Sequence, residues 1–304
     1  MSHRHSIEHF GPAQTAAFAA SCLIWGSTFL AIRLGNEALP PLWSATLRLA
    51  LAAVLNGVIA LSLRAPWPQG AALHGQLQYG FLLFGLNFAL LYWGELTVPS
   101  GIAAVLYATM PLSTAAFAAV LGVHALERSQ LVAALIGLGG VCLIFSGEVT
   151  LGAPIVPLAA VFVAATVSSL GNVILKRTPV HSTFVVNTVG CAVGTGVCAL
   201  GSLLLGETWS APRTWAQWGP ILYLVLLGNL GAFVLFTWLI TQWKVTRLMT
   251  SSLIVPVIAV ILGALVRNEA PAPATYGGAA VVLVAVAVSM GVFRNRDAIE
   301  GQEK

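Results

Sequence analysis

Residues 91–111, LYWGELTVPSGIAAVLYATMP, have a counterpart of equal length later in the chain, and this pair decides the fold that we predict. The counterpart is FTWLITQWKVTRLMTSSLIVP, residues 236–256. Without a gap, Trp93 aligns with Trp238 and Pro111 aligns with Pro256, at an offset of 145 residues (238 − 93). Two further matches lie at nearly the same offset, which indicates an internal repeat.

One of these matches pairs WGSTFLAIR (25–33) with SLGNVILKR (169–177), at an offset of 144 residues (169 − 25). Both stretches begin among small and polar residues and end on a basic residue. The other match pairs Glu127 with Glu269, at an offset of 142 residues (269 − 127), and each precedes a glycine-bearing apolar stretch. We therefore predict two halves of similar structure.

The composition indicates what surrounds the two halves. Hydrophobic residues make up 58% of the chain, charged residues make up 8%, and the mean hydropathy is +0.89. A soluble domain has roughly 25% charged residues, so 24 charged side chains (14 + 10) could not cover 304 residues in water. Most of the surface must face lipid, and the net charge of +4 is no sign of nucleic-acid binding. The four cysteines lack the spacing of a disulfide framework or a zinc site, and we predict no metal and no cofactor.

A membrane-spanning helix needs about 20 mostly apolar residues, and ten stretches of the chain meet this condition. They are roughly 14–33, 42–63, 75–94, 100–121, 129–146, 154–175, 182–205, 219–241, 248–266 and 272–293. The predicted fold class is an all-α integral membrane protein with five spans in each half. Because five is odd, the second half enters the membrane the opposite way up, which is an inverted repeat as in many secondary transporters. The fifth and tenth spans are nearly free of polar groups and are expected to be peripheral packing helices.

The distribution of Lys and Arg predicts the orientation, because cytoplasmic loops carry the excess of these residues. One set of span ends holds ten of them: Arg4, Arg64, Arg128, Lys176, Arg177, Lys244, Arg247, Arg294, Arg296 and Lys304. The opposite set holds three: Arg33, Arg213 and Arg267. We predict a cytoplasmic tail (1–13), a first repeat (14–147), an inverted second repeat (154–293) and a second cytoplasmic tail (294–304).

Several of these features resemble the drug/metabolite transporter (DMT) superfamily, and most closely its EamA-type branch. They are WGS in the first span (25–27), a Pro…Glu…Gly pattern across the last two spans of each half, and ten spans in two halves. The resemblance covers nearly the whole chain and implies a 5+5 helical transporter with a central substrate cavity. Exporters of amino acids, including aromatic ones, and of related metabolites are common in this branch. The first half departs from the pattern, since 16 positions separate Pro111 from Glu127 but 13 separate Pro256 from Glu269.

Charged residues inside spans are the first candidates for ion coupling or substrate binding. Every Asp and Glu falls in a loop or at the end of a span, and no His lies near a midplane. We infer that the substrate is not strongly cationic and that transport is facilitated, down a gradient. Arg48 is the exception, since it lies roughly 10 Å into the second span. It could pair with a substrate carboxylate, or it could snorkel or bond to backbone carbonyls at the outer end.

Polar residues in the middle of spans that also carry aromatic residues would suit a cavity for an amphipathic small molecule. The substrate-binding candidates are Trp25, Ser27, Phe84, Asn87, Tyr107, Pro111, Ser168, Asn172, Asn229, Phe233, Ser252 and Pro256. Asn87 should share a helix face with Phe84, and Asn229 with Phe233, from their spacing of three and four. The two prolines are expected to be matched kinks that act as a hinge or line the site. Alternatively, the polar groups bond between helices and the kinks are static.

Together these features predict a secondary transporter that exports small neutral or zwitterionic metabolites, with apolar or aromatic amino acids favoured, by alternating access. The alternative transporter moves another solute, such as a nucleoside or a lipophilic drug, in either direction and with or without protons. An enzyme is disfavoured because the spans hold no HExxH motif, no paired Asp motif and no His cluster, and a channel is disfavoured as well. We expect an integral protein of a bacterial inner membrane whose partners are its substrate and lipid. The oligomeric state stays open, and a monomer is compatible with these features.

Overall fold

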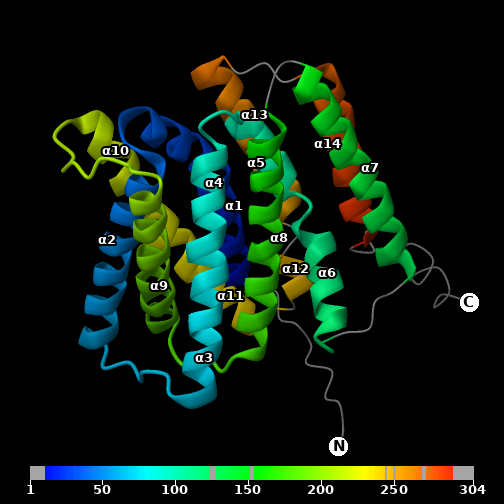
Figure 1. The fold of residues 1–304 in the computed structure, drawn as a ribbon. Coiled ribbons are helices and arrows are strands. Elements are labelled where there is room, and N and C mark those ends of the chain that lie inside the picture. The colour runs from blue at the N-terminus through cyan, green and yellow to red at the C-terminus, as the bar shows by residue number, and fades with distance from the viewer. Residues whose placement is uncertain are drawn as a thin grey trace, which may run out of the picture.

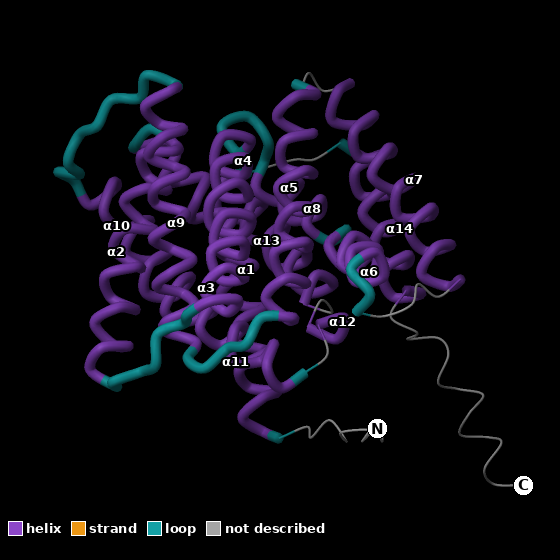
Figure 2. The backbone as a smooth tube through the Cα atoms, turned by 60° about the horizontal axis from the view of Figure 1, so that its bottom comes forward, coloured by secondary structure: helices purple, strands orange, loops and turns teal. Residues whose placement is uncertain are grey.

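The structure is a computed structural model that describes residues 11–123, 128–150, 154–243, 245–248, 251–268 and 272–289. All regular secondary structure in these ranges is helical, which confirms the all-α class (Figures 1 and 2). The elements, with η for a π-helical segment, are α1 (Pro12–Ala38), α2 (Pro41–Ser62), α3 (Gly70–Tyr79), η1 (Gly80–Leu86), α4 (Asn87–Gly94), α5 (Ser100–Tyr107), α6 (Met110–Val120), α7 (Arg128–Thr150), α8 (Ile155–Arg177), α9 (Thr183–Leu204), α10 (Trp215–Tyr223), η2 (Leu224–Phe233), α11 (Val234–Gln242), α12 (Val245–Leu248), α13 (Ser251–Arg267) and α14 (Pro273–Ser289).

Each of the ten predicted spans corresponds to one helix or to a consecutive set of helices. In order these are α1, α2, α3–η1–α4, α5–α6, α7, α8, α9, α10–η2–α11, α12–α13 and α14. Six sections are long and apolar enough to cross a membrane: Pro12–Ala38, Pro41–Ser62, Ser100–Val120, Ile155–Arg177, Thr183–Leu204 and Trp215–Gln242. Shorter apolar helices are Leu135–Ile144, Ile254–Arg267 and Pro273–Ala285. The C-terminal tail, most of the N-terminal tail and both glutamates of the Pro…Glu…Gly pattern lie outside the described residues.

The helices depart from α geometry at matched places in the two halves. The π-helical segments η1 and η2 begin at Gly80 and Leu224, which are 144 residues apart (224 − 80). This distance equals the offset of the sequence repeat. The same irregularity therefore occurs in the third span of each half, and π-helical turns are frequent at functional sites.

The two prolines, by contrast, are not equivalent in the structure. The fourth span breaks between α5 and α6, and Pro111 lies in the first turn of α6. A proline is well tolerated there because the first helical N–H groups have no partner within the helix. Pro256 lies inside α13, where it removes a hydrogen bond of the helix. The prediction of matched kinks is therefore wrong, since one proline begins a helix and the other interrupts one.

The first helices of the two halves run in opposite directions. α1 ends beside the start of α10, where Gln217 Nε2 donates to the carbonyl oxygen of Ala38 (3.2 Å). α8 ends at the other end of the bundle, where Thr178 lies against Gly75 of α3. We call the end with Ala38 the upper end and the end with Thr178 the lower end, as in Figure 1. α1 thus runs upward and α8 downward.

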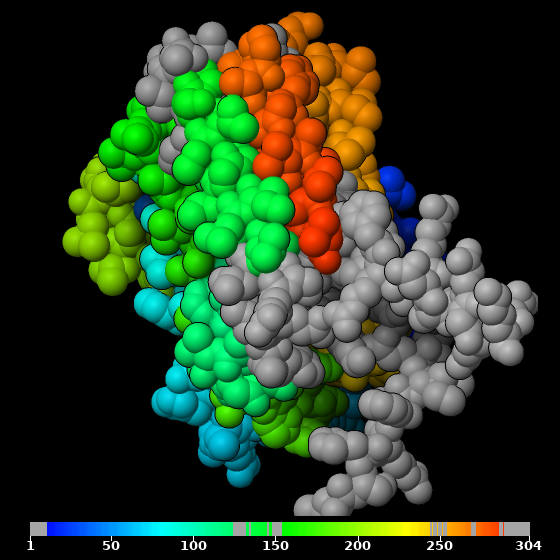
Figure 3. All heavy atoms as spheres, turned by 90° about the vertical axis from the view of Figure 1, so that its right-hand side faces the viewer, coloured from blue at the N-terminus to red at the C-terminus, as the bar shows by residue number. Residues whose placement is uncertain are grey.

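Helices α7 and α14 pack along each other on one flank of the bundle, where the green and orange-red helices lie side by side in Figure 3. They are the fifth and tenth predicted spans, one from each half. Two glycines allow the backbones to meet. A Cβ atom on Gly278 would lie 2.6 Å from the carbonyl oxygen of Gly140, and one on Gly140 would lie 2.8 Å from that of Gly278. Small residues at such positions are the usual basis of close helix packing in membranes.

We expect Gly278→Ala and Gly140→Ala to destabilise the protein, because the added methyl group must push two backbones apart. Overpacking costs about 1–3 kcal/mol, which corresponds to a melting temperature lower by about 2–12 °C in detergent. Gly277→Ala and Gly139→Ala are matched controls, since a Cβ atom there meets nothing within 4 Å. An equal melting temperature for all four variants would show that the two glycines do not set the distance between α7 and α14.

Candidate functional site

A cavity lies between the two halves, midway along the helices. The first half contributes α1, α2, α4, α5 and α6 to its wall, and the second half contributes α8, η2, α11 and α13. The volume of the cavity is about 110 Å³. The lining residues are Trp25, Thr28, Phe29, Ile32, Arg48, Asn87, Phe88, Leu91, Ala104, Tyr107, Met110, Ser168, Asn172, Phe233, Phe236, Ser251, Val255 and Pro256. An apolar wall with a few polar groups is typical of small-molecule sites.

Aromatic rings form much of the cavity wall and bring the two halves into contact. The ring centroid of Trp25 lies 5.6 Å from that of Phe233 and 4.9 Å from that of Phe236. The ring of Phe88 lies 6.0 Å from that of Phe233. Tilted and edge-on pairs at these distances are the preferred arrangements of aromatic side chains. Trp25 and Phe88 belong to the first half and the other two rings to the second, so the cluster spans the seam.

Arg48 is the charged residue of the cavity wall, and its side chain is 2% exposed. Its Nε donates to Asn229 Oδ1 (2.8 Å) and its Nη1 donates to the hydroxyl of Tyr92 (3.1 Å). Its Cζ lies 4.5 Å from the centre of the Phe88 ring, which is a cation–π geometry. Arg48 therefore does not snorkel, and its bonds go to side chains rather than to backbone carbonyls.

The partners of Arg48 are all neutral, and within the described ranges no carboxylate pairs with it. A charged Arg at the centre of a membrane helix costs at least about 2.5–3.5 kcal/mol. The amide, the phenol and the ring offset part of this cost, but they leave the positive charge in place. A buried cation that no described carboxylate pairs with is suited to bind an anionic group of a ligand.

Helix α8 presents two polar side chains to the cavity wall. Ser168 and Asn172 are four residues apart on one face of α8, and both line the cavity. The Oδ1 atom of Asn172 is buried and accepts no hydrogen bond from any described residue. A buried acceptor without a donor is unfavourable, so this oxygen is available to an N–H or O–H group of a ligand.

Asn87 joins two parts of the first half beside the cavity. Its Nδ2 donates to the carbonyl oxygen of Leu83 in η1 (2.9 Å), and its Oδ1 accepts a hydrogen bond from the hydroxyl of Tyr107. Both hydrogen-bonding ends of the amide are therefore used within the protein. Asn87 therefore orients Tyr107 and supports the π-helical segment.

The structure brings seven of the twelve candidates into this wall: Trp25, Asn87, Tyr107, Ser168, Asn172, Phe233 and Pro256. Four others lie outside it. Ser27 shares a hydrogen bond with the hydroxyl of Tyr223 in α10, and Asn229 lies behind the wall, where it holds Arg48. Phe84 is fully buried against α9, and Pro111 is buried at the start of α6. The side chain of Ser252 lies outside the described residues.

Three of the lining residues that are missing from the candidates lie in α1, where they follow a helical spacing. Trp25, Thr28, Phe29 and Ile32 are spaced at i, i+3, i+4 and i+7, which is one face of an α-helix. Extending this spacing from Trp25 would have found three of them and would have excluded Ser27. The sequence predicts Arg48 as a charge within a span, but Arg48 is not among the twelve candidates. Apolar residues such as Val255 carry no signal that separates a cavity wall from ordinary packing.

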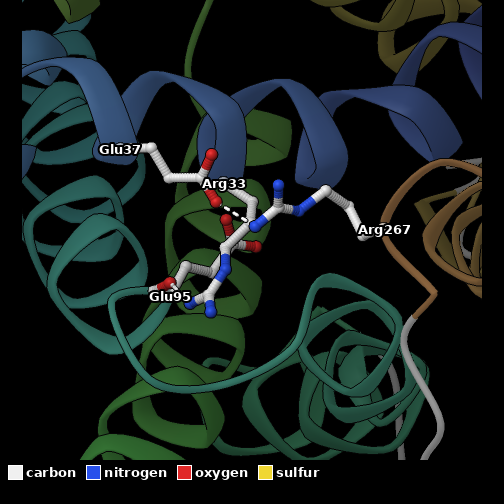
Figure 4. Close-up of polar contacts among 4 residues, drawn as sticks. All are labelled: Arg33, Glu37, Glu95 and Arg267. Carbon is white, nitrogen blue, oxygen red and sulfur yellow. Dashed lines mark hydrogen bonds and ion pairs between the residues drawn. The ribbon is translucent and has the colours of Figure 1, made fainter.

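The halves are joined by different kinds of contact at the two ends of the bundle. At the upper end, Arg267 of α13 forms an ion pair with Glu37 of α1, and beside it, within the first half, Arg33 donates to the backbone carbonyl of Glu95 (Figure 4). At the lower end, within the described residues, the Phe18 ring of the first half lies 5.7 Å from the Trp243 ring of the second. A cavity between two such contacts could open toward either end.

Comparisons with known proteins agree with this architecture. The sequence profile of the EamA-like transporter family matches residues 15–146 and 155–291. The uncharacterized inner membrane transporter YedA of Escherichia coli K12 is 27% identical over 279 residues, covering 91% of this chain and 90% of its own. The uncharacterized transporter YoaV of Bacillus subtilis is 26% identical over 287 residues, covering 90% and 93%. A solved crystal structure at 23% identity covers 92% of this chain and 97% of its own with a TM-score of 0.64, which shows the fold alone.

The ion pair at the upper end should help to keep that end closed. We expect Glu37→Gln to increase labelling of a cysteine at Ser168 by an impermeant thiol reagent added at the upper side. The two side chains are 35% and 44% exposed, and exposed ion pairs contribute about 0.2–1 kcal/mol, so the increase should be up to about fivefold and smaller in high salt. The measurement is the labelling rate in oriented vesicles.

The exchanged pair Glu37→Arg with Arg267→Glu should restore the slow labelling rate. Arg213→Gln is the matched control, since Arg213 is exposed on the loop before α10. A labelling rate that is insensitive to all of these changes would show that the ion pair does not hold the upper end closed.

Proposed function

Because the chain belongs to the EamA-like transporter family, which is a family of transporters and not of enzymes, we propose that it exports small zwitterionic or neutral metabolites. Amino acids with apolar or aromatic side chains are the favoured substrates. They pass through the cavity between the halves by alternating access. The observation that carries this proposal is an aromatic cavity that has a cation without an ion-pair partner among the described residues in its wall, and also a buried neutral acceptor without a hydrogen bond.

An amino acid matches this arrangement group by group. Its carboxylate fits Arg48, because a guanidinium offers a planar fork of N–H donors to two carboxylate oxygens. Its ammonium group fits the acceptor oxygens of Ser168 and Asn172 on α8. Its apolar side chain fits the rings of Trp25 and Phe233. The wall contains no carboxylate, so a substrate that is only cationic would meet the repulsion of Arg48.

The proposed topology has both termini in the cytoplasm, which makes the upper end the outer end. It follows from the ten Lys and Arg residues on one side against three on the other. The repeats are 14–147 and 154–293, flanked by the tails 1–13 and 294–304. The antiparallel arrangement of α1 and α8 supports an inverted repeat, since two similar halves in opposite orientation can exchange conformations. The protein is integral to the membrane, and its similarity to YedA supports an inner-membrane location.

The mechanism that we propose is facilitated transport. Among the eighteen lining residues there is no Asp, Glu, His or Lys, so the cavity wall supplies no side chain suited to carry a proton through each cycle. The ion pair between Glu37 and Arg267 must break for the outer end to open. Separation of the Phe18 and Trp243 rings would open the inner end.

Counterflow in proteoliposomes tests this function. Vesicles loaded with unlabelled phenylalanine, leucine, a nucleoside or an organic cation are given the labelled compound outside, with and without a pH gradient. We expect saturable exchange of phenylalanine and leucine that does not require the pH gradient. Exchange of organic cations alone, driven by protons, would overturn the proposal.

Trp25→Ala should raise the half-saturation concentration of phenylalanine exchange about two- to tenfold. One aromatic pair between the Trp25 ring, which lines the cavity, and the phenyl ring of the substrate would contribute about 0.5–1.5 kcal/mol beyond its buried area. Trp215→Ala is the control, because Trp215 is exposed at the start of α10. Equal half-saturation concentrations for both variants would place the binding site elsewhere.

A further inference from the structure

We propose that this cavity also carries apolar organic monoanions that have a carboxylate but no ammonium group, and that the membrane potential drives their export. The inference rests on the proposed function, because it concerns the same cavity and the same cycle. It extends the substrate class beyond zwitterions, and it names a source of energy for a carrier whose cavity wall has no proton-carrying side chain.

The charge of the cavity wall leads to this substrate class. Arg48 is the one residue among the eighteen lining residues that is charged at neutral pH, so the empty wall carries a charge of +1. A bound monoanion brings the sum to zero, a zwitterion leaves it at +1, and a cation raises it to +2. In a low-dielectric interior such differences dominate binding. The monoanion is therefore the charge type that the wall accepts best.

The geometry of Arg48 shows that its charge remains available. Two of its five N–H groups are used, by Asn229 and by Tyr92, and both acceptors are neutral. Its Nη2 atom makes no hydrogen bond to the described part of the chain. That atom faces Gly228, where a Cβ atom would lie 3.1 Å away, so the glycine leaves room for the guanidinium. The free donors can bind a carboxylate, and the bonds to Asn229 and Tyr92 hold the group in one orientation.

The ammonium group of an amino acid gains much less from the site. Its partners on α8 would be the hydroxyl of Ser168 and the amide oxygen of Asn172, which are neutral. Such acceptors provide hydrogen bonds but do not cancel a charge. A ligand that lacks the ammonium group loses these bonds and avoids the repulsion of Arg48. The carboxylate is therefore the required group and the ammonium an optional one.

Export of a monoanion without a co-transported ion moves one negative charge out of the cell in each cycle. The cell interior is negative, so the potential pulls the anion outward, by about 2.3 kcal/mol per charge for every 100 mV. That energy corresponds to a concentration ratio of roughly 50-fold. A zwitterion has no net charge, so its distribution does not respond to the potential. The direction of transport would then follow from the charge of the substrate.

The test uses the full chain in proteoliposomes with three probes that share a phenyl ring and a two-carbon spacer: 3-phenylpropionate, L-phenylalanine and 2-phenylethylamine. Potassium gradients with valinomycin set the potential at 100 mV, and uptake by protein-free vesicles is subtracted. We expect a steady-state ratio of 3-phenylpropionate of at least tenfold, up to the roughly 50-fold limit, with an electrical current of matching sign. Phenylalanine should reach a ratio near one without current, and phenylethylamine should not be carried.

Two variants connect the effect to Arg48. Arg48→Gln should abolish the current with 3-phenylpropionate. Asn229→Asp retains the arginine and replaces the amide oxygen that accepts from Arg48 Nε at 2.8 Å with a carboxylate oxygen. The negative charge of this carboxylate cancels the positive charge of Arg48. We expect it to lower the affinity for 3-phenylpropionate at least tenfold and to admit 2-phenylethylamine. Arg213→Gln, on an exposed loop, is the control and should behave as the wild type. Monodisperse behaviour in detergent shows that each variant is folded.

Each of the other possible results would contradict either one part of this inference or the proposed function. Transport of phenylalanine without 3-phenylpropionate would overturn this inference and leave the proposed function intact. Transport of 3-phenylpropionate that follows a pH gradient and gives no current would overturn the role of the membrane potential. An unchanged charge preference in Asn229→Asp would show that Arg48 does not select the substrate. No exchange of any probe would count against the proposed function itself.

Discussion

Backbone amide and carbonyl groups cannot remain unpaired in a hydrocarbon layer, and this constraint decides where the helices of this protein can be irregular. The cavity wall includes Asn87, directly after η1, Phe233 at the end of η2, and Tyr107 and Met110 on either side of the break between α5 and α6. Side chains there bond to nearby carbonyls. Asn87 donates to Leu83, Thr109 donates to Leu106 (2.7 Å), and Ser169 of α8 donates to Met110 (3.2 Å). The irregular backbone thus makes room for a cavity without exposing polar groups to lipid.

The second organising feature is the charge of Arg48, which is shared between the halves. The arginine and Tyr92 belong to the first half, whereas Asn229 belongs to η2 of the second. Asn229 lies behind the cavity wall and contacts Arg48 rather than a ligand, so its amide fixes the position of the guanidinium. The same contact joins the halves at the depth of the cavity, between the ion pair at the upper end and the ring contact at the lower end. A ligand that binds Arg48 therefore binds at the point where the two halves meet.

Much of this architecture follows from the sequence, and the errors have identifiable causes. Hydropathy predicted all ten helical sections, because length and apolar content decide what can span a membrane. The segments η1 and η2 begin 144 residues apart, which agrees with the repeat offset of 144–145, although the sequence analysis did not predict π-helical geometry. The expectation that residues three or four apart share a helix face failed in and beside those segments. Phe84 was expected to share a face with Asn87, and Asn229 with Phe233, but each pair lies within or beside a π-helical turn, whose i→i+5 bonds change the facing. One member of each pair lines the cavity and the other does not. Local propensity does not reveal such a turn, and the close approach of Gly80, where η1 begins, to Gly190 of α9 is a tertiary contact that a local pattern does not show.

The π-helical segment η1 also makes the length of the chain a functional property. Each i→i+5 turn contains one residue more than the α-helical turn that it replaces. If the same residues formed one continuous α-helix instead, α4 would turn by about 100° relative to α3. Asn87, Phe88 and Leu91 would then leave the cavity wall together, although none of them had been replaced. Loss of one residue from Gly80–Leu86 would remove the π-helical turn and leave the facing of α4 nearly unchanged. Relatives without the turn should therefore be one residue shorter in this segment if they present the same side chains to their substrates.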